Sequence, residues 1–387
     1  MHAIAHILDT PIERHGGLNL LVRELAMGQS SRYAVYVFCP ENTPDPGPSM
    51  DRPEGCHHCP WPSHLNKEAV LDFLKETIKA HRIEAAFFHG GEFGRGFGSG
   101  SLKAIQSNAP RVACIYVNHQ SSSLLFCRLA GVYRPDLPFV LRSALKFWLL
   151  WLRKMFWLSS ATHEISVSSF ERRQARRRYF PHRRKFMLIY HSRLPARLEP
   201  PSPVTKEKII LNAGHLAYRK GQHVLLRAFG EICRRHPAWK LVFLGAFENT
   251  AYQTLLENLV AEYQIGDRVV FVDEIRDPQP YFQKASIYVQ PSLLEAYGLA
   301  LQEAMRFGCA CVGSDTGGIP ESVLDSTCRF PPGHSVRLSK ILDALMSDPI
   351  HMRSAQSQAV QDDLRMNRGR EQMLEKYDLL LGRLFNS

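Results

Sequence analysis

Residues 289–322 read VQPSLLEAYGLALQEAMRFGCACVGSDTGGIPES, and this stretch decides how the chain folds. An apolar strand stops at Pro291, and the loop that follows it carries Glu295. A helix predicted to begin after Gly298 carries Glu303, and a second apolar strand comes after that helix. Strand, helix and strand in this order are typical of an α/β fold with a parallel sheet.

The two glutamates of this stretch stand eight positions apart, on either side of the predicted helix start. The free backbone N–H groups and the dipole at a helix N-terminus favour an anion such as a phosphate. Carboxylates accept hydrogen bonds from hydroxyl groups, which sugars carry. The pair Gly317-Gly318 follows the second strand, where a glycine backbone can approach a ligand closely. Together these features predict a site for a sugar joined to a diphosphate.

The same alternation of strands and helices runs through the whole chain and predicts doubly wound parallel sheets. The segment 193–208 contains four prolines and is expected to link two domains. We therefore expect two Rossmann-like domains, at 1–200 and 204–369, and a C-terminal helix at about residues 370–387 that packs back on the first domain. Apolar strands are expected at residues 3–8, 34–38, 85–88, 112–117, 164–167, 186–189, 209–213, 241–245, 269–272, 287–290 and 310–313.

The composition is that of a soluble globular protein, because 45% of the 387 residues are hydrophobic and 22% are charged. The first ten residues lack the basic start and the long apolar segment of a signal peptide. The longest apolar runs fall short of the roughly 20 residues that span a bilayer. Nine cysteines scattered through apolar segments fit a reducing compartment. These features predict a cytoplasmic protein.

Five motifs follow one another in the second half of the chain: GHLAYRKG at 214–221, LVFLGAF at 241–247, DRVVFVDEI at 267–275, QPSLLEAYGLALQEAMRFG at 290–308 and SDTGGIPE at 314–321. Over about residues 207–325 they resemble the retaining GT-B glycosyltransferases of family four. The resemblance implies two domains facing a central cleft, the second binding the donor and the first the acceptor. It also implies a nucleotide-diphosphate sugar as co-substrate, with no cofactor and no catalytic metal.

The resemblance assigns roles to residues around the predicted helix start. Two family glutamates with seven residues between them contact the donor: the first matches Glu295 and is associated with the sugar hydroxyls, and the second matches Glu303 and is associated with the ribose. Lys220 matches the lysine that holds the diphosphate, whereas His215 stands where the family usually has arginine, and Arg219 offers a replacement charge. The residues expected to bind the donor are Gly16, Gly17, Arg219, Lys220, Glu274, Ile275, Glu295, Tyr297, Gly298, Leu299 and Glu303.

The predicted pocket for the nucleotide base lies near residues 244–245 and 272–275, and two interpretations of it stay open. Asp273 or Glu274 could accept hydrogen bonds from guanine N1 and N2, which favours a GDP-linked sugar. A solvated surface loop explains both acids equally well. The expected donor is therefore either UDP-linked or GDP-linked.

His119 follows the predicted strand 112–117, and a single histidine there indicates by itself only a structural hydrogen bond. The resembled family places a histidine after this strand beside the transferred sugar, across from the donor and near the glycine-rich loop with Gly16 and Gly17. The resemblance also implies that the leaving phosphate takes the acceptor proton on the same face, so no general base is assigned. The expected catalytic residues are His119, Glu295 and Lys220, the last of which stabilises charge on the departing diphosphate.

A basic block lies between residues 139 and 186, where twelve Lys or Arg stand against two acidic residues in a chain with a net charge of +11. Its helical segment 139–158 carries three tryptophans, and clustered cations with tryptophans suit an anionic lipid surface. Alternatively, the aromatic face packs on the sheet of the first domain. Both hold if the arginines meet phospholipid while the tryptophans are buried. The membrane or acceptor candidates are Arg142, Lys146, Trp148, Trp151, Arg153, Arg172, Arg173, Arg176 and Arg177. Nucleic acid is not expected, since no recognised binding module accompanies the charge.

Residues 56–59 read CHHC, which is half of a zinc-site pattern. A structural zinc site needs four ligands, and the sequence shows no second CxxC to complete it. We expect a strand end or loop with free thiols here, and no metal site.

These expectations combine into a retaining glycosyltransferase that acts on a lipid-linked or cell-surface glycan, such as lipopolysaccharide, capsule or exopolysaccharide, as a peripheral protein at the cytoplasmic face of the inner membrane. Two other classes stay open: a GT-B-shaped epimerase or phosphorylase, and a catalytically silent scaffold that binds anionic lipid or nucleic acid. The spacing of Glu295 and Glu303 with a glycine-rich first loop favours transfer over the first class. The presence of Lys220 and His119 beside these glutamates speaks against the second.

Overall fold

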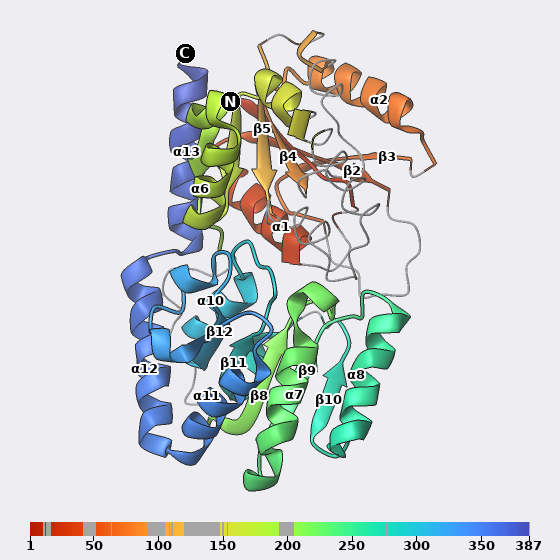
Figure 1. Ribbon diagram of the computed structural model, residues 1–387. Helices are drawn as coiled ribbons and strands as arrows, with labels where there is room; N and C mark the ends of the chain where they lie inside the picture. Colours follow the sequence, from red (N-terminus) through yellow and green to blue (C-terminus); the bar gives the residue numbers. More distant parts are fainter. Residues whose placement is uncertain are drawn as a thin grey trace. The chain divides into compact units, whose positions relative to one another are not determined.

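The computed structural model describes residues 1–10, 12, 17–41, 52–62, 64–90, 105–107, 109, 111–119, 148, 151–152, 154–192, 205–275 and 277–386. The chain forms two compact units (Figure 1). Unit 1 comprises Met1–Tyr190 with Met373–Ser387, and unit 2 comprises His191–Gln372. Each unit is built on one parallel sheet covered by helices, which confirms the expected α/β fold of two doubly wound halves.

The sheet of unit 1 has seven strands in the order β3-β2-β1-β4-β5-β6-β7, and all neighbours are parallel. The strands are β1 (Ala3–Ile7), β2 (Ala34–Pro40), β3 (His57–Trp61), β4 (Ala85–Gly90), β5 (Ala113–Asn118), β6 (His163–Ser166) and β7 (Phe186–Leu188). The helices of this unit with defined bounds are α1 (Gly17–Gln29), α2 (Lys67–Ala80), α6 (Ser169–Arg178), the 3₁₀ helix η1 (Phe180–Lys185) and α13 (Arg370–Phe385).

Side chains of one strand point alternately to the two faces of the sheet. Ala5 and Ile7 of β1 belong to an apolar core that includes residues of α2 and α6 and the buried Trp157. His6 between them lies on the opposite face, where it contacts Gln29 of α1. Polar side chains therefore lie within the otherwise apolar packing of that second face.

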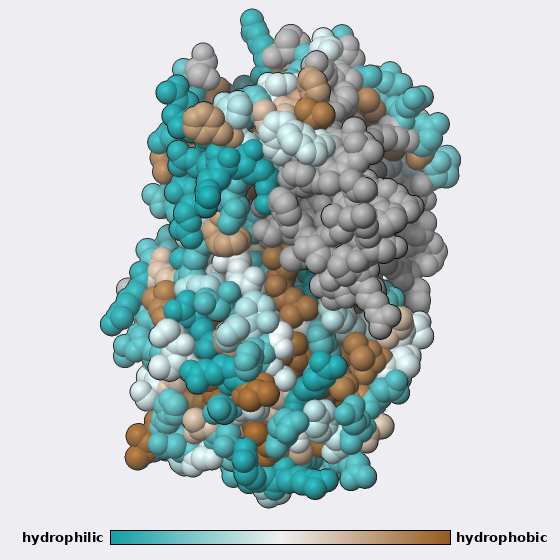
Figure 2. Space-filling model, viewed as in Figure 1, coloured by the Kyte–Doolittle hydropathy of each residue, from teal (hydrophilic) through white to brown (hydrophobic). Residues whose placement is uncertain are grey.

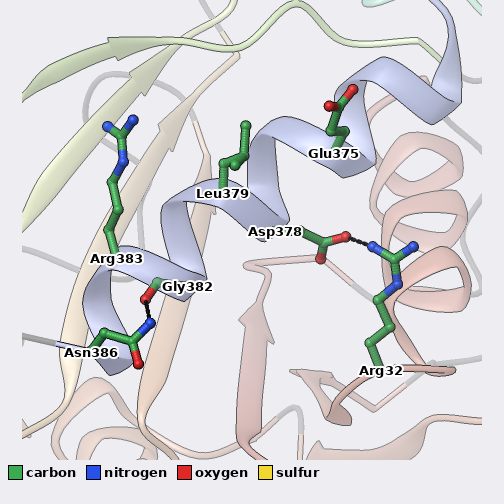
Figure 3. A pocket seen from close by; sticks show the side chains of 7 residues that line it. All are labelled: Arg32, Glu375, Asp378, Leu379, Gly382, Arg383 and Asn386. Atoms are coloured by element: carbon green, nitrogen blue, oxygen red, sulfur yellow. Dashed lines mark hydrogen bonds and ion pairs between the residues drawn. The ribbon is translucent and has the colours of Figure 1, made fainter.

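The C-terminal helix α13 packs on unit 1, as expected from the sequence. Tyr377 is fully buried with its ring 5.4 Å from that of Phe87, and Phe385 stacks on His2 at 4.2 Å. Asp378 forms an ion pair with Arg32, toward which it points in Figure 3. A groove of about 490 Å³ beside this contact is lined by Arg32, Glu375, Asp378, Leu379, Gly382, Arg383 and Asn386.

The sheet of unit 2 has six parallel strands in the order β10-β9-β8-β11-β12-β13. The strands are β8 (Glu207–Ala213), β9 (Lys240–Leu244), β10 (Val269–Val272), β11 (Ala285–Gln290), β12 (Ala310–Ser314) and β13 (Arg329–Phe330). The α-helices are α7 (Gln222–Ile232), α8 (Thr250–Tyr263), α9 (Gln279–Lys284), α10 (Leu299–Arg306), α11 (Ser335–Ser347) and α12 (Pro349–Met366). The 3₁₀ helices are η2 (Tyr218–Lys220), η3 (Cys233–Arg235), η4 (Ile319–Glu321) and η5 (Ser326–Cys328).

Apolar residues of the unit 2 strands supply two cores, one on each face of the sheet. Ile287 and Val289 of β11 pack with α7, α8 and α11, whereas Tyr288 between them packs with α9 and α10. Both faces are covered, so apolar residues stand at consecutive positions in these strands and not only at alternate ones. This explains why continuous apolar runs predicted β8 to β12, whereas the two-residue strand β13 was not predicted.

Strand β3 (His57–Trp61) is an edge strand that the sequence did not predict as such. It contains most of the CHHC stretch, for which we expected a strand end or a loop. The thiols of Cys56 and Cys59 are free, and Cys39 Sγ lies 3.3 Å from His58 Nε2. Only Trp61 of this strand is fully buried, so the usual apolar strand signal is missing.

Candidate active site

The candidate site lies at the carboxyl ends of β8 and β11 in unit 2. Strand β8, the first of this sheet, lies between β9 and β11, so the connections from β8 and β11 diverge to opposite sides. In open α/β sheets, ligands bind outside the strand ends at such a switch point. Four expected donor residues, namely Arg219, Lys220, Glu295 and Gly298, stand in the two loops that begin there.

The loop after β8 approaches the loop after β11 closely because of Gly221. This glycine has a left-handed conformation with φ of 72°, and a Cβ on it would lie 2.0 Å from the carbonyl oxygen of Pro291. The backbone oxygen of Arg219 accepts a hydrogen bond from Leu293 N at 2.8 Å. Any side chain at position 221 would therefore push the two loops apart.

Lys220 and Glu295 contact each other directly across these two loops. Lys220 Nζ lies 2.6 Å from Glu295 Oε2, and the two side chains are 19% and 10% exposed. The same oxygen accepts hydrogen bonds from Gln290 Nε2 at 3.1 Å and from Ser292 Oγ at 3.2 Å. A carboxylate with several donors on one oxygen is held in one orientation, and its other oxygen can accept from a ligand.

The charge of Glu295 is set by two opposing effects. Burial alone would raise the pKa of its carboxyl group. Burial is the largest single effect, but the Lys220 ammonium, Arg219 and the Ser292 hydroxyl together outweigh it and hold the pKa of Glu295 below its usual value. Glu295 is therefore an ionised hydrogen-bond acceptor at neutral pH.

The glycine pair after β12 supports the backbone of Glu295. Gly317 has φ of 57°, and a Cβ on it would lie 1.7 Å from the carbonyl oxygen of Glu295. Gly318 N donates to that same oxygen at 3.2 Å. The motif therefore acts as a support for the acidic loop, which sequence reasoning had included only as part of a donor site.

Helix α10 begins after Gly298, which has a left-handed conformation with φ of 89°, and Leu299 is its first residue. Glu303 on this helix is only 5% exposed, so it is not a solvated surface glutamate. Tyr297 is buried as well, with the Arg368 guanidinium 5.9 Å from the centre of its ring. Buried residues therefore lie on both sides of the start of α10, whereas Gly298, Leu299 and Ala300 themselves are half-buried.

Two further donor candidates, Glu274 and Ile275, follow β10. His215 Nδ1 lies 3.8 Å from Glu274 Oε1, so the histidine that replaces the expected arginine faces an acidic group. Asp273 accepts from the backbone N–H of Glu274 at 2.7 Å, and Ile275 packs against the apolar core next to α10. The structure thus brings His215 and Glu274 together, a proximity that the sequence had not indicated.

In unit 1, His119 follows β5 and its Nε2 lies 3.1 Å from Nδ1 of His89. Gly17 is the first residue of α1, where an added Cβ would meet no described atom within 4 Å, and Gly16 lies outside the described residues. Sequence reasoning missed His89 and also His6, which contacts His89 in turn. The signal that could have revealed them is a histidine near the carboxyl end of three apolar strands.

The basic block is partly described, since Arg142, Lys146 and Arg153 lie outside the described residues. Residues 148, 151–152 and 154–160 are helical. The expected burial of the aromatic face holds for Trp157 at 7% exposure, but Trp148 is 59% exposed. Trp151 Nε1 donates to the Arg178 carbonyl at 3.1 Å, which fixes this helix to the end of α6.

The arginines of α6 differ in how far their side chains are exposed to solvent. Arg172 is half-buried, whereas Arg173, Arg176 and Arg177 are exposed. Hydrophilic side chains gather over α6 in Figure 2.

Within the described part of the chain, no group of three or more His, Cys, Asp or Glu side chains is placed to hold a metal ion. Among the same residues, no helix is both long and apolar enough to cross a membrane.

Two known families match this chain, and together they cover most of it. Residues 197–362 match the family described as Glycosyl transferases group 1, and residues 15–192 match Glycosyltransferase Family 4. The chain belongs to the group 1 glycosyltransferases. The family resemblance inferred from the five sequence motifs of the second half is thereby confirmed, and the first half matches a glycosyltransferase family as well.

Proteins similar to this glycosyltransferase include enzymes named for glycolipid and lipopolysaccharide synthesis. The gpi3 subunit of phosphatidylinositol N-acetylglucosaminyltransferase from Schizosaccharomyces pombe is 27% identical over 50% of this chain and 42% of its own length. The lipopolysaccharide core biosynthesis mannosyltransferase LpcC of Rhizobium leguminosarum bv. viciae is 31% identical over 29% of this chain and 32% of its own length. The matches thus span less than half the length of these curated relatives.

The fold has a close counterpart among solved structures. HepE of Anabaena, solved in complex with UDP and glucose, superposes with a TM-score of 0.72 at 15% identity, covering 99% of this chain and 100% of HepE. At this identity the likeness shows the fold alone. It confirms the two-sheet GT-B architecture for this chain.

Proposed function

We propose that this protein is a retaining glycosyltransferase that moves a sugar from a nucleotide diphosphate to a lipid-linked or cell-surface glycan. The observation that carries the proposal is the contact of Lys220 with Glu295 at the switch point of the unit 2 sheet, beside the start of α10. One relative is named for transfer to phosphatidylinositol and another for lipopolysaccharide core synthesis, which supports an acceptor of this kind.

The Lys220–Glu295 pair provides a cation for the diphosphate and a carboxylate for the sugar hydroxyls of a nucleotide sugar. When the diphosphate arrives, its oxygens compete for the Lys220 ammonium, and the Glu295 carboxylate becomes available to sugar hydroxyls. Lys220 and the N-terminus of α10 then stabilise the negative charge that develops on the departing diphosphate. We assign Glu303 to the ribose and His119 to the transferred sugar, and the leaving phosphate itself to acceptance of the proton from the acceptor hydroxyl.

Thermal unfolding with UDP, GDP, UDP-glucose and GDP-mannose tests the donor site. A nucleotide that binds only the folded chain stabilises it by about 2.7 kcal/mol at a hundred times its dissociation constant, so we expect one nucleotide series to raise the unfolding temperature. The nucleotide sugar of that series should release its free nucleotide, UDP or GDP, when a glycan acceptor is added. Absence of any shift with all four compounds would contradict the proposal. Transfer with inversion at the anomeric carbon would contradict its retaining mechanism alone.

We further propose that unit 1 meets anionic membrane lipid through an aromatic–basic surface, formed by Trp148, Leu152, Phe156, Phe180, Arg173, Arg176, Arg177, Arg183 and Arg184. Trp148, Leu152 and Phe156 are spaced four residues apart, as on one face of a helix, and are 59%, 43% and 66% exposed. The Arg183 guanidinium lies 4.7 Å from the ring of the exposed Phe180. Exposed aromatic side chains beside arginines suit the interface of an anionic bilayer.

The triple variant Arg173→Gln, Arg176→Gln, Arg177→Gln is expected to bind anionic vesicles about a hundredfold more weakly, since each basic residue near such a surface contributes about 1 kcal/mol. Flotation with phosphatidylglycerol vesicles at low salt measures the partition. The matched control changes three exposed basic residues of unit 2, Arg337, Lys340 and Arg353, to Gln and should leave flotation unchanged. Equal flotation of the two triple variants would exclude this surface.

A further inference from the structure

Three histidines and a glutamine form a continuous chain of contacts across the sheet of unit 1. His6 Nε2 lies 2.8 Å from Gln29 Oε1, and His6 Nδ1 lies 2.9 Å from His89 Nε2. His89 Nδ1 lies in turn 3.1 Å from His119 Nε2. His6, His89 and Gln29 are all buried, so the chain runs from the protein interior to the end of β5.

The register of the parallel strands produces this chain. His6 of β1 pairs with Phe87 of β4, and His89 stands two residues further along the same face. His89 pairs with Val117 of β5, and His119 again stands two residues further along. Each step therefore moves to the next strand and toward the carboxyl edge, while the three rings stay on one face.

The glutamine at the buried end gives the chain one direction. The Gln29 amide oxygen can only accept a hydrogen bond, so the His6 Nε2 that it contacts carries a proton. Burial lowers the pKa of His6 to about 4 against the opposing effect of the Gln29 hydrogen bond, so this ring is neutral near pH 7. A neutral imidazole has one N–H, and His6 Nδ1 is therefore an acceptor.

The proton positions in the two remaining contacts follow from the same rule, that a neutral imidazole has one N–H and one accepting nitrogen. Because His6 Nδ1 accepts, the proton between the first two rings belongs to His89 Nε2. In neutral His89 the Nδ1 then accepts, and the proton of the last contact belongs to His119 Nε2. Reversing a single ring would place two N–H groups or two lone pairs against each other in a buried setting, which is costly.

We propose that Gln29, His6 and His89 are positioning residues that hold neutral His119 with its proton on Nε2 and its Nδ1 as the accepting nitrogen. The hydrogen bond made by one ring nitrogen of a functional histidine commonly fixes which nitrogen carries the proton. Here two further histidines, His6 and His89, extend that control to Gln29 on helix α1, and we call this series of hydrogen bonds the histidine relay. The role of His119 at the transferred sugar rests on the proposed function. An accepting Nδ1 suits a sugar hydroxyl, which can donate to it.

Nitrogen-15 NMR of the histidine side chains at about pH 8, where an ordinary imidazole is neutral, tests the relay directly. We expect coupling across two N–H···N bonds, from His89 Nε2 to His6 Nδ1 and from His119 Nε2 to His89 Nδ1, with the proton on Nε2 in each. In Gln29→Leu the buried His6 Nε2–H loses its acceptor, so a second set of signals with reversed protons should appear on all three rings. The His223 ring in unit 2 should stay unchanged.

Several outcomes would overturn the relay. The Gln29 amide nitrogen is buried without a hydrogen-bond partner among the described residues, and the opposite amide orientation would put the proton of His119 on Nδ1. That tautomer in the unmodified protein, missing coupling between the rings, or a Gln29→Leu spectrum identical to that of the unmodified chain would each contradict the proposal. The coupling measurement needs no variant, so it decides even if Gln29→Leu does not fold.

Steady-state kinetics of the Gln29→Leu variant distinguishes failure of the histidine relay from failure of the proposed function. With a donor and an acceptor identified, Gln29→Leu should lower kcat about tenfold through the misplaced His119 proton while KM for the donor stays constant. Gln361→Leu, at an exposed glutamine of α12, is the matched control and should change neither value. If the couplings are present but no sugar is transferred by any variant, the relay stands and the proposed function fails.

Discussion

We expect Lys220→Met to lower kcat for sugar transfer by about 10²–10³-fold, the usual effect of removing one group that stabilises charge in a transition state. In the structure, Lys220 Nζ is held 2.6 Å from Glu295 Oε2, so its position is fixed before any donor arrives. The diphosphate takes on negative charge as it leaves, and a methionine of similar length offers none in return. Steady-state kinetics with the preferred nucleotide sugar measures the loss.

The variant also leaves Glu295 without its cation, and the stability change must be separated from the catalytic one. A buried carboxylate that loses its ion-pair partner destabilises a fold. The double variant Lys220→Met, Glu295→Gln should regain thermal stability and remain inactive, whereas Lys240→Met at an exposed lysine of β9 should behave like the unmodified protein. Recovery of activity together with stability in the double variant would show that Lys220 has no role in the transfer step.

The donor half of the candidate site was readable from the sequence because its parts are local. Glu295, Gly298 and Glu303 lie within nine residues of one another, around a single strand end and helix start. Their contact with Lys220 was not readable, since it depends on β8 and β11 being neighbours in the sheet and on Gly221 allowing their loops to touch. Sequence spacing predicts which residues share a loop, whereas the strand order decides which loops meet.

The histidine relay shows the same limit more strongly. His119 was predicted from the resemblance, but His6 and His89 lie 113 and 30 positions away in the chain and meet it only through the register of β1, β4 and β5. Strand β3 was missed for a different reason. Its polar residues, His57 and His58, do not give the apolar signal of the buried strands, because an edge strand needs less burial.

Arg306→Met is expected to destabilise unit 2 by about 3–5 kcal/mol, the usual cost of breaking a buried ion pair by removing one partner. Arg306 Nε lies 2.7 Å from Asp363 Oδ2 and its Nη2 lies 3.0 Å from Asp363 Oδ1, with the two side chains 5% and 3% exposed. The planar guanidinium matches both carboxylate oxygens, so the pair fixes α10 against α12. Without arginine, a buried carboxylate is left uncompensated.

Urea unfolding, with hydrogen exchange of α10 and α12 as the local readout, measures this loss. The double variant Arg306→Met, Asp363→Leu removes both charges and should recover most of the stability, because an apolar pair of similar volume often replaces a buried ion pair at little cost. Arg365→Met, at an arginine that is 69% exposed, is the matched control and should change the free energy of unfolding by less than about 1 kcal/mol. Because α10 begins at Leu299, directly after the Gly298 cap, loosening its far end in the single variant should also weaken nucleotide binding. The double variant should restore that binding. A single variant as stable as the control would show that the pair does not hold these helices together.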